Sequence, residues 1–213
     1  PIPKLIKKFI AKFYRKIENI FLMKMSGITV PQPIMIDMYK KYNPNIISVS
    51  NFYINDKSEI STNFVKHKNF KNLIYSGSVS EERGFSNMIN LINDLPSNYI
   101  LNIAGEVKDN LKNSIPKKLH KKIILHGFLN IYDLRSLYKI CGIGLIMFNN
   151  IGQYYMSYSL KLFEYMHYGM FIVMPDFGEW IKFNKTYSVG LNFNTKNAKQ
   201  CANKIKALDL EYL

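Results

Sequence analysis

The chain of 213 residues is 47% hydrophobic and 21% charged, so it can bury a substantial core and does not belong to the disordered class. Its formal net charge of +14 favours anionic partners such as nucleotide phosphates, nucleic acid or an acidic membrane surface. The lysines are scattered over many segments, so charge alone does not choose among these partners. The apolar runs are too short to span a bilayer, which predicts no membrane-spanning segment.

Few residues point to a metal or redox centre. Cys141 and Cys201 lie far apart and lack the spacing of metal ligands or redox pairs, which favours a reducing cytosol. The four histidines also lack ligand spacing, so we predict no metal site and no cofactor. No signal peptide is visible, and the first residue is Pro1 rather than methionine, so we expect the chain to be a fragment.

The first predicted element is an amphipathic helix over residues 4–25. Its basic side carries seven lysines and arginines against Glu18 alone, a net charge of +6. The pattern favours a helix packed on a domain, and it also fits a helix lying on an anionic membrane surface. The apolar residues that recur at helical spacing are Leu5, Ile6, Phe9, Phe13, Ile17, Ile20 and Phe21.

A domain boundary is predicted in the polar stretch that follows. A strand or turn at 26–33, a brief helix at 34–41 and a short buried strand at 46–49 come first. Residues 55–71 have no hydrophobic period and are interpreted as a linker. The chain is therefore expected to divide into residues 1–54, the linker, and a main domain over residues 72–213.

Short apolar strands alternate with helices through the main domain, which predicts an α/β fold. The expected architecture is a Rossmann-like parallel sheet with helices on both faces, and ligands in such sheets bind where strands end and helices begin. The predicted strands are 73–75, 99–104, 123–125, 143–148 and 171–174, and the predicted helices are 85–95, 111–118, 131–138, 160–168, 179–183 and 198–208.

The turn after the first of these strands contains Gly77 and Ser78 and ends with Arg83 just before a helix. A guanidinium beside a helix N-terminus is suited to hold a diphosphate in a two-pronged contact. The alternative is a surface turn in which Arg83 pairs with Glu81 or Glu82. The turn lacks the G-x-G-x-x-G pattern, which argues against a dinucleotide-dependent dehydrogenase.

The segment 159–176 combines a helix start with two charged residues on one face. Ser159 is a suitable N-cap, and Lys161 and Glu164 are three residues apart. A lysine and free amides at a helix start can bind phosphate oxygens, and a carboxylate one turn further can accept hydrogen bonds from a ribose. The alternative is an ordinary surface ion pair between Lys161 and Glu164.

The run Ser159-x-Lys-Leu-Phe-Glu-Tyr-Met-x-x-Gly169, followed by an apolar strand and Pro-Asp, resembles the donor-site helix of family 4 glycosyltransferases. The turn 75–84 resembles the glycine loop of that family, and His126-Gly-Phe128 resembles the strand–glycine turn beside which the nucleobase lies. The resemblance spans about residues 72–208. It implies a GT-B fold, with residues 72–213 as its C-terminal, donor-binding half and residues 1–54 as a remnant of the N-terminal acceptor domain and crossover.

By this resemblance, Glu164 matches the acid that holds the ribose, Arg83 the residue on the diphosphate, and Ser159 and Leu160 the amides that face the phosphates. The family's other acid falls at Met156, and Ser78 stands where an arginine is common. No catalytic residue is assigned, because most of the acceptor domain is absent. The predicted donor site comprises Gly77, Ser78, Arg83, Gly127, Phe128, Ser159, Leu160, Lys161 and Glu164.

The resemblance implies a glycosyltransferase that moves a sugar from a UDP- or GDP-sugar to a glycan or lipid-linked acceptor with retention of configuration, in glycan or polysaccharide biosynthesis. The absence of an Asp-x-Asp motif argues for metal-independent transfer. The fragment alone is expected to have little activity, in the cytoplasm or peripheral on the inner face of the membrane.

Two alternatives remain open. One is a basic nucleic-acid-binding module, which the charge and 14% aromatic content favour although no nucleic-acid-binding signature is present. The other is a non-catalytic adaptor that keeps the fold.

Overall fold

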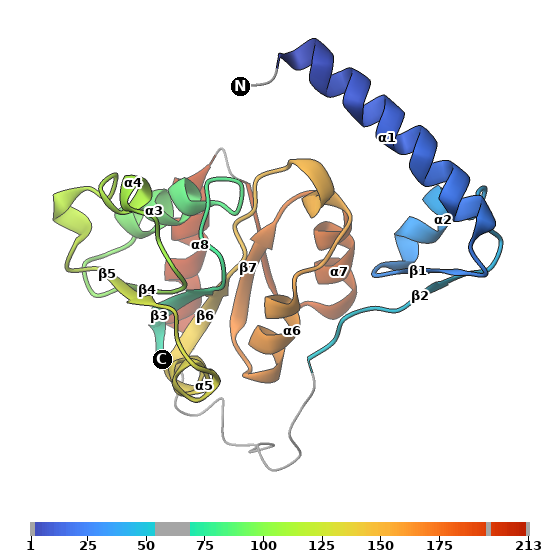
Figure 1. Ribbon diagram of the computed structural model, residues 1–213. Helices are drawn as coiled ribbons and strands as arrows, with labels where there is room; N and C mark the ends of the chain where they lie inside the picture. Colours follow the sequence, from blue (N-terminus) through green and yellow to red (C-terminus); the bar gives the residue numbers. More distant parts are fainter. Residues whose placement is uncertain (1–2, 54–68, 195–196, 212–213) are drawn as a thin grey trace. The chain divides into compact units, whose positions relative to one another are not determined.

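The computed structural model describes residues 3–53, 69–194 and 197–211 and divides the chain into two compact units, Pro1–Asn51 and Phe52–Leu213 (Figure 1). The predicted linker 55–71 lies outside the described residues up to residue 68. Its last three residues belong to the first strand of the second unit, so the linker as predicted is too long at that end.

The first unit contains the predicted amphipathic helix and a small parallel sheet. Helix α1 (Lys4–Lys24) confirms the helix predicted over residues 4–25. Asn43 fixes the end of this helix, because its side-chain amide donates to the carbonyls of Leu22 and Met25 at 3.1 and 2.7 Å. The remaining elements are β1 (Ile28–Val30), η1 (Pro33–Met35), α2 (Ile36–Tyr39) and β2 (Ile46–Ser48), and β1 pairs with β2.

The apolar stripe of α1 is exposed. Phe9 is 74% exposed, and Phe13 and Phe21 are each 60% exposed. Among the described residues, therefore, nothing covers this stripe in the way that the packing interpretation of the sequence expects. In the same part of the chain, no helix is both long and apolar enough to cross a bilayer.

The second unit is a six-stranded, wholly parallel sheet, which confirms the predicted α/β class. The strand order is β5-β4-β3-β6-β7-β8, so the direction of chain progression reverses between β3 and β6. The strands are β3 (Asn69–Ser76), β4 (Ile100–Ala104), β5 (Ile123–Gly127), β6 (Cys141–Leu145), β7 (Phe171–Pro175) and β8 (Gly190–Phe193). The helical segments are α3 (Phe85–Asp94), α4 (Asp109–Lys112), η4 (Lys117–Leu119), α5 (Ile131–Ile140), η5 (Gly152–Tyr155), α6 (Leu160–His167), α7 (Glu179–Tyr187) and α8 (Ala198–Glu211).

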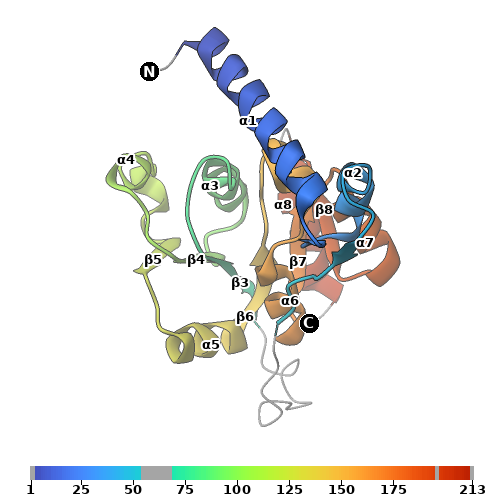
Figure 2. The same ribbon diagram turned by 45° about the vertical axis from the view of Figure 1, so that its right-hand side comes forward.

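Helices cover both faces of this sheet, as Figures 1 and 2 show. Alternate residues of β3 belong to separate cores: Leu73 and Tyr75 face α3 and α8, whereas Ile74 faces α5, α6 and α7. This period of two is what a strand buried on both sides requires. The sheet therefore forms the middle layer between two helical layers.

Two predicted elements differ from those observed. The helix predicted at 111–118 is interrupted, because Pro116 has no amide to donate and α4 ends at Lys112 before the 3-10 turn η4 begins. Strand β6 runs from Cys141 to Leu145, earlier than the predicted 143–148, although Ile146–Phe148 are also buried. The apolar run continues past the strand because the loop beyond it is packed inside the domain.

The start of α3 lies directly against the loop after β6. Gly84, the N-cap of α3, has φ +87°, and a Cβ built there would lie 1.8 Å from the carbonyl oxygen of Met147. No side chain fits at this position without displacing backbone. The contact therefore fixes how close the turns after β3 and β6 can come.

We predict that Gly84→Ala lowers the free energy of unfolding by about 3 kcal/mol, because it combines left-handed strain with overpacking against backbone. Gly152→Ala is the matched control: its φ is +54°, but nothing lies within 4 Å of the added Cβ, so only about 1 kcal/mol is lost. Urea unfolding followed by circular dichroism measures both. Equal losses in the two variants would contradict the close contact.

Candidate functional site

The candidate site lies at the carboxyl ends of β3 and β6, where the strand order reverses. The turns after these strands are joined by side-chain hydrogen bonds. Asn87 Nδ2 donates to the Met147 carbonyl at 3.0 Å, and Asn149 Nδ2 donates to the Glu81 carbonyl at 2.6 Å. Ligands of doubly wound sheets bind in the crevice at this kind of reversal.

The turn that follows β3 packs directly on the turn that follows β4. Gly77 has φ +105°, and its amide donates to the Ala104 carbonyl at 2.8 Å. A Cβ on Gly105 would lie 2.0 Å from the Gly77 carbonyl oxygen, so backbone meets backbone here. The Tyr75 hydroxyl donates to the Ser78 carbonyl at 2.7 Å and closes the turn from below. Gly77 and Ser78 remain exposed, so a ligand can reach their backbone.

Arg83 is half-buried at the far end of this turn, beside the phenols of Tyr75 and Tyr154. Burial by itself lowers the pKa of the guanidinium, but its interactions with these two phenols, Tyr154 first, outweigh burial and raise it. Within the described ranges no ion pair joins Arg83 to Glu81 or Glu82, so the surface-pair alternative is wrong. The guanidinium stays charged and is held by neutral partners.

Lys161 is the most unusual residue of the site. It is only 6% exposed, and its Nζ has no hydrogen-bond partner in the described part of the chain. The ammonium lies 3.8 Å from the centroid of the Tyr75 ring and 5.5 Å from that of Phe148. A Cβ on Gly77 would be 3.6 Å from it, so the lysine reaches from α6 to the turn after β3.

The surroundings of Lys161 disfavour its charge. Burial, and secondarily the nearby Arg83, lower the pKa of Lys161 to about 7, whereas Glu164 acts in the opposite direction. The surface ion pair that the spacing of Lys161 and Glu164 allowed is therefore wrong, because Lys161 turns inward. A buried amine without a hydrogen bond destabilises the fold, and cation–π contact offsets only part of that cost.

Glu164 is half-buried, one turn beyond Lys161 on α6. Its Oε2 accepts a hydrogen bond of 3.0 Å from the Tyr138 hydroxyl, which also lies 2.7 Å from Ser76 Oγ. No hydrogen bond to Oε1 is present within the described ranges. One carboxylate oxygen is thus held by the protein, and the other is open to a ligand.

Ser159 occupies the N-cap position of α6, as predicted, with extended backbone angles of −93° and 143°. Its side chain makes no capping hydrogen bond, so the hydroxyl is not used by the helix start. Leu160, the first helical residue, is 44% exposed. The first amides of a helix have no partner inside the helix, so this end can donate to an anion.

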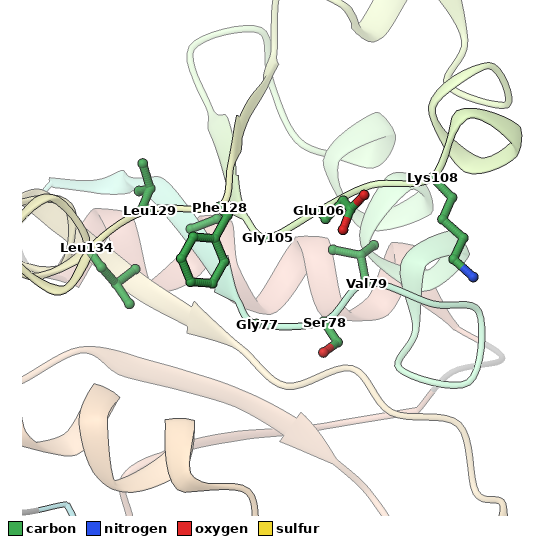
Figure 3. Close-up of a pocket in the computed structure, with 10 residues that line it drawn as sticks. Gly77, Ser78, Val79, Gly105, Glu106, Lys108, Phe128, Leu129 and Leu134 are labelled. Carbon is green, nitrogen blue, oxygen red and sulfur yellow. The ribbon is translucent and has the colours of Figure 1, made fainter.

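A pocket of about 430 Å³ adjoins the turn of Gly77 and Ser78 (Figure 3). Figure 3 shows Phe128 and Leu134 at one end of the pocket and Lys108 at the other. Phe128 is 92% exposed, whereas Gly127, with φ +66°, shapes the turn before it and is not a lining residue. The lining residues are Gly77, Ser78, Val79, Ala104, Gly105, Glu106, Lys108, Phe128, Leu129 and Leu134.

The structure thus places Gly77, Arg83 and Lys161 close to one another. Ser159 and Leu160 lie at the start of the helix that carries Lys161 and Glu164, and Ser78 and Phe128 line the adjoining pocket. The sequence did not single out Tyr75, Ser76 or Tyr138 as site residues, although they contact its charged groups. They belong to apolar runs, where polar tips are indistinguishable from core. Among the described residues no cluster of three metal-ligating side chains is present.

A parallel sheet that gathers glycine turns, two cations and a helix start at its reversal point is a Rossmann-like domain built for an anionic ligand. Residues 56–210 match the family described as Glycosyl transferases group 1. The chain therefore belongs to this family of sugar-transferring enzymes. None of the curated proteins compared matches the chain.

Solved glycosyltransferase structures share the fold. WaaG, a glycosyltransferase involved in lipopolysaccharide biosynthesis, is 14% identical, with a TM-score of 0.66 over 86% of this chain and 55% of its own. HepE from Anabaena, in complex with UDP and glucose, is 12% identical, with a TM-score of 0.64 over 88% and 55%. TarM is 18% identical, with a TM-score of 0.71 over 92% and 40%. The chain thus spans about half the length of the first two, and the likeness establishes the GT-B fold.

We predict that Lys161→Met raises the free energy of unfolding by about 1–3 kcal/mol near pH 7, because it removes an unsatisfied buried amine and keeps the apolar stem. The unfolded chain protonates this lysine below about pH 10.4 and the folded chain only below about 7. The destabilisation of the native protein therefore grows as pH falls from about 10 to 7 and is constant below 7.

Urea unfolding between pH 6 and pH 9.5 measures this difference. Lys185→Met, at an exposed lysine of α7, is the matched control and should change stability by less than about 0.5 kcal/mol at every pH. If Lys161→Met destabilises the protein, or if its effect is the same at pH 7 and 9.5, the buried amine is not as described.

Proposed function

We propose that this chain is the C-terminal, donor-binding half of a GT-B glycosyltransferase of the family 4 type. It would hold a nucleotide-diphosphate sugar whose sugar is transferred to a glycan or lipid-linked acceptor. The observation that carries the proposal is the buried, unpartnered ammonium of Lys161 beside Gly77 and Arg83. Two neighbouring cations without an anion are unfavourable alone, and a diphosphate would satisfy both.

The diphosphate would have three kinds of donor. Lys161 and Arg83 supply charge, the exposed backbone at Gly77 and Ser78 supplies an approach without side chains, and the start of α6 at Ser159 supplies helix amides. The dipole of α6 adds to the positive potential at this end. Lys161 also compensates for Ser78, which stands where related enzymes often carry an arginine.

The nucleoside would continue from the diphosphate toward the β5 side. Glu164 Oε1 is open to accept hydrogen bonds from ribose hydroxyls. The pocket of about 430 Å³ adjoins the same turn and has the exposed Phe128 ring at one end, which offers a face for base stacking. Uracil and guanine both remain candidates for the base.

Catalysis by this half would be electrostatic. When the bond between the anomeric carbon and the diphosphate breaks, negative charge grows on the leaving oxygen, and preorganised cations and amides stabilise it. We propose transfer without a metal ion and with retention, the acceptor hydroxyl attacking from the face that the leaving group vacates. The acceptor and the remaining catalytic contacts would come from the other half, so this chain alone would have little activity.

Two related structures support this assignment. HepE was crystallised with UDP and glucose, and S. aureus TarM with UDP and alpha-GlcNAc-glycerol. Both titles name a nucleoside diphosphate, which is the ligand that the charges at Lys161 and Arg83 favour.

We predict that the chain binds UDP- or GDP-sugars and that Arg83→Met, Lys161→Met and Glu164→Ala each weaken binding about tenfold or more, because each removes a hydrogen bond to or from a charged group. Calorimetric titration with UDP-, GDP- and ADP-glucose measures this, and Lys185→Met is the control expected to bind like the native chain. Failure of all three nucleotide-sugars to bind at millimolar concentration would contradict the proposal.

The same titrations separate the other two candidates. Salt-sensitive binding to random-sequence DNA that UDP does not disturb would favour a nucleic-acid-binding module. Binding in which Glu164→Ala has no effect would favour an adaptor that has kept the fold without the site.

We further propose that α1 lies on an anionic lipid surface, which would make the protein peripheral on the cytoplasmic face of a membrane. The helix has a net charge of +6 over residues 4–25, and its apolar stripe, including Phe9 and Phe13, is exposed. Basic charge beside exposed aromatic side chains is the combination that binds acidic headgroups.

We predict that the chain floats with phosphatidylglycerol-containing vesicles and not with pure phosphatidylcholine vesicles, and that salt weakens the association. Replacing Phe9 and Phe13 by serine should abolish flotation. Tyr132→Ser, at a residue of α5 that is 75% exposed, is the control expected to have no effect. Flotation that is independent of acidic lipid, or that survives the double replacement, would exclude α1 as the lipid contact.

A further inference from the structure

Three buried hydroxyls connect the end of β3 with α5 and α6. Ser76 is the last residue of β3, Tyr138 belongs to α5 and Tyr165 to α6, and each is at most 4% exposed. Tyr165 Oη lies 3.1 Å from the Ser76 amide and 3.2 Å from Ser76 Oγ, and Tyr138 Oη lies 2.7 Å from the same Oγ. The rings of the two tyrosines meet edge to face, with centroids 5.7 Å apart.

Only one member of this network also touches the candidate donor site. Tyr138 Oη lies 3.0 Å from Glu164 Oε2, whereas Tyr165 makes no hydrogen bond to Glu164. Burial, first of all, raises the pKa of Tyr138 far above its usual value, so the phenol remains a proton donor at any physiological pH. A neutral phenol facing a carboxylate gives a charge-assisted hydrogen bond, which is stronger than one between neutral groups.

A glutamate has reason to need such a partner. Its terminal torsion is broad rather than three-fold, so the carboxylate does not fix its own plane, and its long side chain loses rotamer freedom when a ligand orders it. Here Tyr138 is itself immobilised, because it is 1% exposed and packs on the rings of Tyr165 and Tyr168. The fixed hydroxyl therefore determines where Oε2 lies and toward which side Oε1 is turned.

We propose that Tyr138 is a positioning residue that holds Glu164 so that Oε1 can accept hydrogen bonds from the ribose of a bound nucleotide, which makes the site selective for ribose over deoxyribose. This inference rests on the proposed nucleotide-sugar function and adds a residue to it. Tyr138 does not touch the nucleotide. It acts through Glu164, and its loss is felt only by ligands that present a ribose hydroxyl to that carboxylate.

The test compares Tyr138→Phe with Tyr165→Phe. Each variant removes one buried phenolic hydroxyl from the same network and keeps the ring, but only Tyr138→Phe removes a contact to Glu164. Binding of UDP and GDP, and of the 2′-deoxy and 3′-deoxy forms of each, is measured by calorimetry for the native chain and both variants.

For the nucleotide that binds, Tyr138→Phe should weaken the ribonucleotide about tenfold. It should weaken at least one of the two deoxy forms about twofold or less, because the hydroxyl that Glu164 accepts is already missing from that form. Tyr165→Phe should weaken all three forms equally or not at all. A double variant, Tyr138→Phe with Glu164→Gln, should bind no more weakly than Glu164→Gln alone, since the two residues act as one unit.

Equal weakening of ribo and deoxy forms by Tyr138→Phe would overturn the inference and leave a structural role only. Unchanged binding of the ribonucleotide would also overturn it while leaving the proposed function intact, whereas failure of the native chain to bind any nucleotide would refute both. If Tyr138→Phe does not fold by circular dichroism, Glu164→Asp takes its place. It draws the carboxylate away from Tyr138, and it must lose the preference for ribose or the inference fails.

Discussion

The turns that follow β3 and β6 are in backbone contact, and the geometry of the site depends on how close they come. Gly84 lies where a Cβ would collide with the Met147 carbonyl, and Asn87 and Asn149 join the two turns by hydrogen bonds. Because the chain reverses its order across the sheet between these strands, this contact gathers segments from different halves of the domain. Arg83 from one turn and Lys161 from the helix after the other are thereby brought near the same glycine.

A site assembled in this way carries a cost that the rest of the domain must offset. Lys161 has no hydrogen-bond partner among the described residues, and Arg83 nearby has only phenols as partners. Charges of one sign that are buried together destabilise the folded chain until an anion joins them. Two aromatic-rich cores, one on each face of the sheet, supply the packing that makes this tolerable. Residues that evolved for binding commonly lower stability in this manner.

The order and type of the elements in the second unit followed from the sequence because strands buried on both sides form short apolar runs between helical patterns. The start of β3 was missed because Asn69 and Lys71 flank Phe70 in a polar stretch, and only pairing with β6 makes them a strand. The nine predicted site residues came from turn chemistry and resemblance. The burial of Lys161 could not be predicted, because spacing alone places it beside Glu164 on a helix face, and only the position of Tyr75 shows that the side chain turns inward. Tyr138 was read as core for the same reason.

The sole tryptophan gives the site an optical reporter. Trp180 is fully buried on α7, and its indole Nε1 donates to the Tyr154 carbonyl at 2.8 Å. The phenol of that same tyrosine is the main partner of Arg83, and the ring of Phe148, which faces the Lys161 ammonium, lies 5.9 Å from the indole. Anything that engages the two cations therefore perturbs the electric field and the hydrogen bond at a single fluorophore. The emission maximum of the unlabelled protein is a direct signal of occupancy, with no second tryptophan to dilute it.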